Sequence, residues 1–477
     1  MGQSVECTSF DRRDFARFGR HLAVETALLH DLVERDELSH HAPVAGLELE
    51  AWLIDAQGRP APRNDEFIDR VASPDIVTEL GRFNIEINVP PQPVRGSGLG
   101  RLAAGLDAAW GRCRDSAAQM GLQVVAIGIL PTLTDADLTM ANLSDRARYR
   151  ALNQQVLRQC HGHANCVEIT GASGDVLRSV HRDVMLEAAA TSFQVHLQVP
   201  AEQTLRAYNA AIIASAPVVA LSCNSPLLFG RRLWQETRIP LFEQSLGVGA
   251  REDGRHAALS RVSFGSGYAG YSLLECFREN LERFEPLLPV QLAEGAERLP
   301  HLRLHNGTIW RWNRPLAGFD DDGRVHLRIE HRPMAAGPTL ADMMAQLAFT
   351  IGLVVALSTE PVPPESELPF DAARDNFQAA ARQGLDAVLR WTDGCQWPAR
   401  ALLLRLLERA RDGLDALGVD AGLAEPWLAL LRARLEGGIN GARWQLDRLD
   451  QLGGDLAALT LDYARHQAGG MPIHLWR

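Results

Sequence analysis

The sequence has 477 residues, a formal net charge of −11 and 46% hydrophobic residues, which allows a sizeable core and excludes a globally disordered chain. The negative charge argues against a general nucleic-acid binder. All 48 basic residues are arginine, so enzymes that need a Schiff-base lysine, a P-loop lysine or a protein-kinase lysine are excluded.

Predicted helices and strands alternate through the first part of the chain. Apolar residues at helical spacing predict helices, and apolar or alternating runs between turn signals predict strands. In chain order we expect a helix over 9–38, a strand over 46–55, a helix over 64–80, a strand over 82–91, a helix over 99–120, a buried strand over 122–130, a helix over 144–160, a strand over 165–170, a helix over 180–190, a strand over 192–200 and an apolar helix over 203–221.

The middle of the chain begins with a stretch, 228–256, that is rich in arginine, glycine and charge. This composition predicts a long functional loop. Beyond it, 301–305 and 326–332 alternate apolar and polar residues and predict strands, and the apolar segment 339–358 predicts a helix.

The end of the chain differs in character. The Pro- and Glu-rich stretch 359–369 predicts a linker. Residues 370–466 are rich in alanine, leucine and arginine at helical spacing, which predicts a helical bundle. We therefore expect a catalytic domain over 1–360 and a C-terminal helical extension over 370–477.

The chain shows no pattern of a membrane or secreted protein. Its longest apolar runs, 210–221 and 347–357, are too short to span a bilayer. The seven cysteines are scattered and odd in number, which does not indicate a disulfide framework. We expect a soluble cytoplasmic protein that binds neither a membrane nor nucleic acid.

Four predicted strands carry polar side chains on one face only. Side chains alternate between the two faces of a strand, so the apolar residues of each segment gather on one side. The opposite face carries Glu48, Glu50 and Trp52 in 46–55, Asn84, Glu86 and Asn88 in 82–91, Ser192, Gln194, His196 and Gln198 in 192–200, and His326, Arg328, Glu330 and Arg332 in 326–332.

Two interpretations fit this polar face. An antiparallel sheet with one solvated face produces the same alternation. Carboxylates, amides and imidazole are also ligands of hard divalent cations, and bound ions relieve the repulsion between Glu48 and Glu50. The pattern alone leaves open a solvated face or a site for several Mg²⁺ or Mn²⁺ ions.

Five stretches between about residues 44 and 357 carry a resemblance to a known family. They are GLELEAWLID (46–55), TELGRFNIEINVPP (78–91), TSFQVHLQVP (191–200), LHNGTIWRWNRP (304–315) and LRIEHRP (327–333). In this order they resemble the glutamate–cysteine ligase type 2 family, which includes the bacterial carboxylate–amine ligases. The resemblance implies an α+β fold, a curved, mostly antiparallel β-sheet funnel of the glutamine synthetase-like kind. Helices cover its outside, and here a C-terminal helical region is added.

The resemblance implies an enzyme that joins a carboxylate to an amine. The reaction would depend on ATP and on Mg²⁺ or Mn²⁺ and would proceed through an acyl phosphate. Cations must be fixed around the transferring phosphoryl group. By matching motifs, the metal-ligand candidates are Glu48, Glu50, Glu86, His196 and Glu330. The catalytic candidates, which bind the phosphoryl group or a substrate carboxylate, are Arg332 and Arg311. The candidates for closing over nucleotide or substrate are Arg231, Arg232 and Arg238.

Three other functions compete with the ligase. They are a guanidino-kinase-like phosphotransferase, a non-catalytic member that binds a small acid or a partner protein, and a metal-dependent hydrolase that needs no ATP. The expected partners of the ligase are small molecules, an amino acid carboxylate and an amine. Nothing in the sequence selects cysteine over another amine, and a homo-oligomer stays open because sheet edges and the added helices both offer interfaces.

Overall fold

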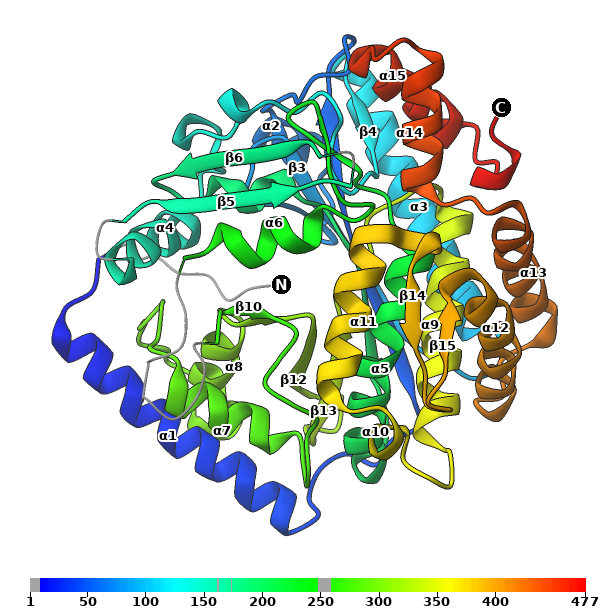
Figure 1. Cartoon of the computed structure of the whole chain (residues 1–477). Helices are drawn as coiled ribbons and strands as arrows, with labels where there is room; N and C mark the ends of the chain where they lie inside the picture. The colour runs from blue at the N-terminus through cyan, green and yellow to red at the C-terminus, as the bar shows by residue number, and fades with distance from the viewer. Residues whose placement is uncertain (1–8, 161–162, 173, 248–258) are drawn as a thin grey trace.

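The computed structural model describes residues 9–160, 163–172, 174–247 and 259–477, and a curved seven-stranded sheet runs through it (Figure 1). Six strands lie in the order β12-β13-β7-β1-β3-β2, and β4 pairs with the end of β1. Every pair in this sheet is antiparallel, as predicted. The strands are β1 (Val44–Ile54), β2 (Ile76–Thr78), β3 (Asn84–Pro93), β4 (Gln123–Val125), β7 (Phe193–Gln198), β12 (Asn313–Phe319) and β13 (Val325–His331).

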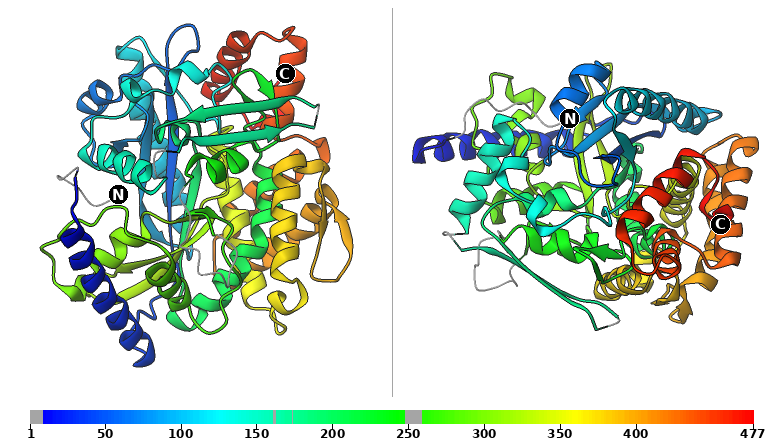
Figure 2. Two further views of the ribbon diagram at one scale, coloured as in Figure 1. Left: turned by 60° about the vertical axis from the view of Figure 1, so that its left-hand side comes forward. Right: turned by 90° about the horizontal axis from the view of Figure 1, so that it is seen from above.

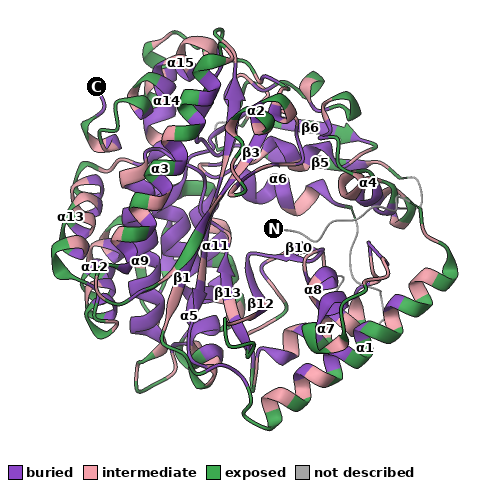
Figure 3. Cartoon of the chain, turned by 180° about the vertical axis from the view of Figure 1, so that it is seen from behind, coloured by how far each residue is buried: buried purple, intermediate pink, exposed green. Residues whose placement is uncertain are grey.

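Long helices cover the apolar face of the sheet. Helix α3 (Gly98–Gln119) contacts β3, α5 (Thr204–Ser222) contacts β12 and β13, and α9 (Leu340–Ser358) contacts β7. The apolar residues at alternate strand positions, such as Leu49 and Val195, are buried beneath them. Figure 3 shows buried residues gathered along β1, α5 and α9, so the core lies between the sheet and these helices.

Two helical segments are apolar all round. Ala201–Ser222 and α9 are long and apolar enough to cross a membrane by length and composition alone. In each, 89% of the most apolar window is buried inside the fold. These two segments are apolar on every side because they are buried between the sheet and the next layer of helices.

The C-terminal helices pack directly onto this layer (Figure 1). Helices α12 and α13 contact α9, α11 contacts α5, and Arg434 of α13 pairs with Asp342 of α9 at 3.2 Å with both side chains fully buried. The division into 1–360 and 370–477 stays a prediction. The elements of this segment are α10 (Pro364–Glu367), α11 (Phe370–Gln383), η6 (Gly384–Asp386), β14 (Val388–Arg390), β15 (Gln396–Pro398), α12 (Ala399–Ala416), α13 (Ala421–Gly437), α14 (Gly441–Gln451), α15 (Leu456–Ala468) and η7 (Ile473–Leu475).

The remaining elements lie around the sheet and the helices that cover it (Figure 2). Helix α6 contacts the 3₁₀ helix η3, and α1 contacts α7 and α8. These elements are α1 (Arg12–Glu34), α2 (Asn64–Val71), η1 (Asp135–Asp137), η2 (Met140–Asn142), α4 (Ala147–Gln159), β5 (Asn165–Thr170), β6 (Val176–His181), η3 (Met185–Ala189), η4 (Ala201–Gln203), β8 (Leu227–Leu228), β9 (Arg231–Arg232), α6 (Arg238–Ser245), β10 (Val262–Ser263), α7 (Leu274–Arg283), η5 (Ala296–Arg298), α8 (Pro300–Asn306) and β11 (Trp310–Arg311).

The strand predicted over 301–305 is wrong, because these residues belong to α8. Pro300 occupies the first turn of this helix, where a missing N–H costs nothing. His301 and His305 lie one helical turn apart, and both rings contact Phe18 of α1 at centroid distances of 5.2 and 6.5 Å. The alternation of histidine and leucine therefore reflects a helix that is buried on most sides.

Three other predicted elements are shorter than expected. The helix predicted over 64–80 ends at Val71, where Ala72 takes a left-handed conformation with φ 47°. The buried strand predicted over 122–130 ends at Val125, because side chains of α15 bind the next peptide: Tyr463 Oη donates to Ala126 O at 3.0 Å. The helix predicted over 180–190 is only the 3₁₀ helix η3.

The functional loop predicted over 228–256 contains regular structure. Strands β8 and β9 form a short hairpin, and α6 follows it. Residues 248–256 of the predicted loop lie outside the described residues.

Candidate active site and metal centre

The register of the sheet brings the predicted metal ligands together. Glu50 of β1 stands directly opposite Glu86 of β3, and Glu330 of β13 stands directly opposite His196 of β7. Facing residues on antiparallel strands hold their side chains on the same side of the sheet. The four strands therefore present their carboxylates and the imidazole to one shared space.

The first ligand group consists of Glu48, His196 and Glu330. His196 Nε2 lies 3.1 Å from Glu48 Oε1 and 3.8 Å from Glu330 Oε1. This nitrogen is buried, and its close contacts with these oxygens do not have the geometry of a hydrogen bond. A buried imidazole nitrogen between two carboxylate oxygens has the donor chemistry of a divalent cation site.

The second ligand group consists of Glu50, Glu79 and Glu86, whose oxygens lie within 4.8 Å of one another. Burial, together with the charges of Glu86 and Glu50, raises the pKa of Glu79 well above its usual value. Burial and the charge of Glu48 raise the pKa of Glu86 to about 7. Three crowded carboxylates become compatible when a divalent cation takes the place of their protons.

Glu79 was missed by the sequence analysis. It follows β2 directly and lies in the segment that was assigned to a helix. In the structure β2 pairs with β3, with Val77 opposite Glu86, which brings Glu79 close to the polar face of the sheet. The only signal in the sequence was its place inside the motif TELGRFNIEINVPP.

Arginines fix the charge of Glu330. Arg314 Nε and Nη2 donate to the two oxygens of Glu330 at 2.6 and 2.9 Å, and Arg332 Nη1 donates to Oε2 at 3.2 Å. Burial raises the pKa of Glu330, but Arg314, Arg332 and His196 outweigh it and hold the pKa well below its usual range. Glu330 is therefore an ionised ligand candidate.

The second ligand group opens into a cavity, called here the inner cavity. Its lining includes Glu50, Glu79, Glu187, Arg238, Trp312 and Arg332. Arg332 Nη1 also donates to Gln194 Oε1 at 2.5 Å, while its Nε is buried and has no partner among the described residues. The cavity thus places an arginine with a free donor beside the carboxylates of the sheet.

Of the predicted arginines, Arg238 and Arg332 reach the inner cavity. Arg238 is held by Glu236 Oε1 at 2.9 Å and Pro333 O at 2.6 Å. Arg311 is buried elsewhere and donates to Glu279 and Asn280, each at 2.6 Å. Arg232 pairs with Asp450, and Arg231 is exposed on the β8–β9 hairpin.

Arg231, Arg232 and Arg311 are therefore not among the residues that line the inner cavity. Arg311 holds α7 against β11 through Glu279 and Asn280, and Arg232 connects β9 to α14 through Asp450. The roles predicted for these three arginines stay predictions.

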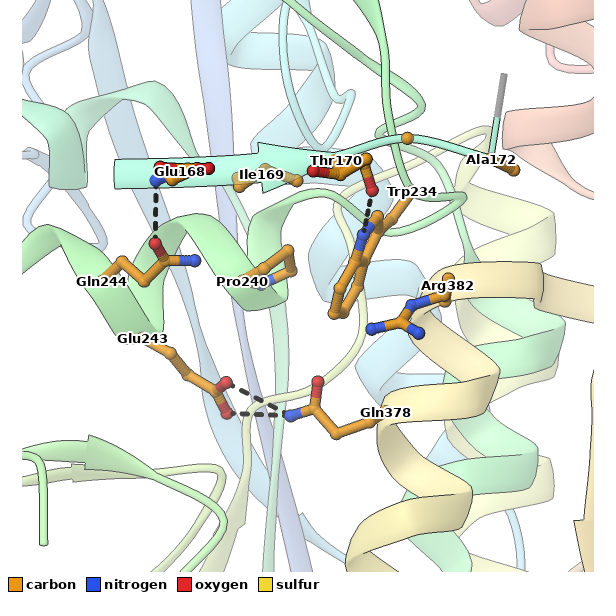
Figure 4. Close-up of a pocket in the computed structure, with 11 residues that line it drawn as sticks. Glu168, Ile169, Thr170, Ala172, Trp234, Pro240, Glu243, Gln244, Gln378 and Arg382 are labelled. Atoms are coloured by element: carbon orange, nitrogen blue, oxygen red, sulfur yellow. Dashed lines mark hydrogen bonds between the residues drawn. The ribbon is translucent and has the colours of Figure 1, made fainter. Parts of the chain in front are cut away.

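A second cavity of about 600 Å³ lies on the other side of α6, between β5 and α11 (Figure 4). Trp234, Glu243, Gln378 and Arg382 line it. Glu243 accepts hydrogen bonds from Gln378 Nε2 at 3.2 Å and from Trp312 Nε1 at 2.9 Å, and Trp312 also lines the inner cavity. Helix α6 is thus the wall between the two cavities.

Comparison with known proteins identifies the family of the chain. A sequence model described as glutamate-cysteine ligase family 2 (GCS2) matches residues 44–462. Among curated proteins, none matches the chain by sequence.

Solved structures resemble the chain over most of its length. The glutamate–cysteine ligase from Francisella tularensis, solved in complex with AMP, shares 10% identity over 91% of this chain and 89% of that chain, with a TM-score of 0.58. The bifunctional glutathione synthetase from Pasteurella multocida shares 10% identity over 93% of this chain and 55% of that chain, with a TM-score of 0.51.

The likeness of these folds confirms the predicted fold class, and the family match confirms the predicted kind of enzyme, an ATP-dependent carbon–nitrogen ligase. The match also runs through the predicted boundary at 360–370 and includes most of the C-terminal helices. The chain belongs to glutamate-cysteine ligase family 2.

Proposed function

We propose that the protein joins the carboxylate of a small acid to an amine in a reaction that consumes ATP, requires Mg²⁺ or Mn²⁺ and proceeds through an acyl phosphate. The observation that carries this proposal is the convergence of two ligand groups on one face of the sheet, beside Arg332. Transfer of a phosphoryl group to a carboxylate is stabilised by such fixed cations and by an arginine placed beside them.

The two ligand groups suit divalent cations. Glu48, His196 and Glu330 would hold one ion, and Glu50, Glu79 and Glu86 another. The position of His196 Nε2 between oxygens of Glu48 and Glu330, and the crowded carboxylates of the second group, support this assignment. Bound cations supply neutralisation of the phosphate oxygens during transfer.

Two arginines suit the anions of the reaction. Arg332 is oriented by Gln194 and Glu330, and its unpartnered Nε is available to an oxygen of the γ-phosphoryl group or of the acyl phosphate. Arg238 is fixed at the wall of the inner cavity by Glu236 and Pro333, where it would bind the carboxylate of the acid.

The comparisons support a nucleotide and a pair of substrates to test. The Francisella tularensis ligase was solved with AMP, which supports an adenine nucleotide as a ligand of this fold. Glutamate and cysteine, the substrates that the family name gives, are the first pair to test. Small-molecule substrates and a cytoplasmic location remain part of the proposal.

The test is phosphate release from ATP and Mg²⁺ with glutamate present and amines added one at a time: cysteine, other amino acids and simple alkylamines. We expect phosphate release that depends on one amine, with the matching amide in the mass spectrum. ADP formation without phosphate release would indicate the phosphotransferase, and amide-bond cleavage without ATP would indicate the hydrolase. Absence of any turnover, with nucleotide or acid bound, would indicate the non-catalytic member.

A further inference from the structure

One carboxylate of the inner cavity belongs to neither ligand group. Glu187 of η3 lines the cavity together with Glu50 and Glu79. Its Oε2 is buried and has no hydrogen-bond partner among the residues that the structure describes. A buried carboxylate oxygen without a donor is costly, so it points to a ligand that supplies one.

The surrounding charges do not satisfy Glu187. Burial and the charge of Glu50 raise its pKa to about 7, although Arg332 and Arg148 act in the opposite direction. The Nη1 of Arg332 is already bonded to Gln194 and Glu330. The cavity is thus arranged to accept one more positive group, or one more N–H donor, at this oxygen.

The position of Glu187 relates this oxygen to the reacting groups. The inner cavity that it lines also contains Arg332, proposed to bind the acyl phosphate, and Arg238, proposed to bind the acid. Ala188, Phe242 and Trp312 contribute apolar surface to the same cavity. Near such surface water is displaced, and a carboxylate that faces a cation attracts it more strongly than it does in bulk water.

We propose that Glu187 binds the amine substrate as its ammonium form and accepts a proton from it when the nitrogen attacks the acyl carbon. This role rests on the proposed ligase function and identifies the second substrate as a primary aliphatic amine. A secondary or aromatic amine would present fewer N–H donors or a weaker positive charge to Oε2.

The proton balance of the step is complete. The ammonium group carries three N–H protons, and the amide keeps one. Glu187 takes the first proton, which frees the nitrogen lone pair to form the carbon–nitrogen bond. The bond between the acyl carbon and the phosphate oxygen then breaks, and the phosphate leaves with that electron pair and takes the second proton.

Hydroxylamine tests proton transfer to Glu187 separately from formation of the acyl phosphate. It is largely uncharged near neutral pH, so it attacks an acyl phosphate without first losing a proton, and the resulting hydroxamate is measured by colour with ferric ion. The experiment compares the wild type with Glu187→Gln at pH 7.5, with ATP, Mg²⁺ and glutamate, or another amino acid as the acid. The nucleophile is either hydroxylamine or the best amine of the panel.

We expect Glu187→Gln to lower kcat/KM for the amine by about 10²-fold, because positioned proton transfer contributes 10²–10⁴-fold, and to leave hydroxamate formation within about 3-fold of the wild type. Glu187→Asp keeps the carboxylate, so it should retain more amine activity than Glu187→Gln. It also provides the comparison if Glu187→Gln does not fold.

Glu243→Gln is the matched control, since Glu243 is a buried carboxylate of the second cavity. The amide oxygen of the glutamine can still accept from Trp312 Nε1, and Gln378 can rotate its amide to fit. It should leave the ratio of amine to hydroxylamine activity unchanged. Equal losses of both activities in Glu187→Gln would overturn the role of Glu187. A wild type that forms neither amide nor hydroxamate would instead overturn the ligase proposal, and the role of Glu187 with it.

Discussion

Glu50 of β1 lies between the polar residues near β7 and those of β3. Its Oε2 accepts the backbone N–H of Ser192 at 2.7 Å, and its Oε1 accepts Gln194 Nε2 at 2.9 Å. Across the sheet it faces Glu86. These donors fix the direction of the carboxylate, so Glu50 is oriented as a ligand before a cation arrives.

Replacement of Glu50 by glutamine should remove activity without removing the fold. The amide keeps the size of the side chain but lacks the charge, so we expect kcat/KM to fall by at least about 10²-fold and Mn²⁺ binding to weaken. Turnover, Mn²⁺ titration by electron paramagnetic resonance and circular dichroism measure these effects.

The surface variant Glu168→Gln, which removes a carboxylate paired with Arg178, is the control. It should retain both activity and metal affinity. Near-normal turnover of Glu50→Gln, with an unchanged metal requirement, would contradict the assignment of this ligand.

The sequence predicted the residues whose position depends on strand alternation alone. Glu48, Glu50, Glu86, His196 and Glu330 share a face because each lies inside a regular strand. Their roles as ligands remain predictions. Glu79 follows β2 directly and Glu187 lies in the 3₁₀ helix η3, so strand alternation fixes the direction of neither side chain.

At the scale of elements, the pair β12–β13 carries a buried ion pair beside the first ligand group. Arg314 of β12 stands opposite Glu330 of β13 and binds both of its oxygens. Arg314 therefore neutralises Glu330 when no cation is present, and it competes with a cation for the same oxygens.

The variant Arg314→Met tests this competition. Removal of one partner from a buried pair costs about 3–5 kcal/mol, so we expect a lower melting temperature in the presence of a chelator. Mn²⁺ should raise the melting temperature of the variant by more than that of the wild type, because Glu330 has then lost the arginine that binds both of its oxygens and keeps only the single contact with Arg332. An equal Mn²⁺-induced shift in both proteins would show that Glu330 does not bind the ion.

Helix α8 shows why short segments are difficult to assign. The histidines of 301–305 were interpreted as the polar side of a strand, but both are buried, and His305 Nε2 bonds the backbone oxygen of Asn280 at 3.0 Å. Burial, together with Arg261 and Arg311, lowers the pKa of His305 to about 4. The strand was assigned because its polar residues were expected to face solvent. Tertiary contacts bury both histidines, so that expectation fails here.

The same histidine predicts a pH dependence of stability. The unfolded chain binds a proton at His305 near pH 6.5 and the folded chain only near pH 4, so His305 contributes stability above pH 6.5 that is lost as the pH falls toward 4. We expect the melting temperature of His305→Gln to fall less than that of the wild type between these values. Identical pH profiles would contradict a neutral, buried His305.

At the scale of the whole molecule, α9 connects the sheet to the C-terminal helices. It contacts β7 on one side and α12 and α13 on the other. Asp342 of α9 binds Arg434 of α13 and accepts the backbone N–H of Ile473 at 3.1 Å. These contacts join segments that lie far apart in the sequence, which is why periodicity predicted the helices but not their packing.

The variant Asp342→Ala measures how far the two predicted parts depend on one another. It leaves Arg434 buried without its carboxylate, at a cost of about 3–5 kcal/mol. We expect one cooperative unfolding transition at a lower temperature, with loss of activity at that temperature. Two separate transitions, with activity lost only in the second, would instead support an independent domain over 1–360.

The fold class was predictable because strand alternation and five ordered motifs agree with each other, and the family match extends this agreement to 44–462. The inner cavity was not predictable, because α6 and η3 form one wall of it through contacts between distant segments. In the role proposed for Glu187, the choice of amine depends on that wall.

The most direct test of the central claim is oxygen transfer from the acid to phosphate. The enzyme is supplied with ATP, Mg²⁺, the amine and the acid labelled with ¹⁸O in its carboxylate, and the released phosphate is examined by mass spectrometry. An acyl phosphate requires one labelled oxygen in each phosphate released with the amide. Unlabelled phosphate would mean that the carboxylate never attacked ATP, and it would contradict the ligase.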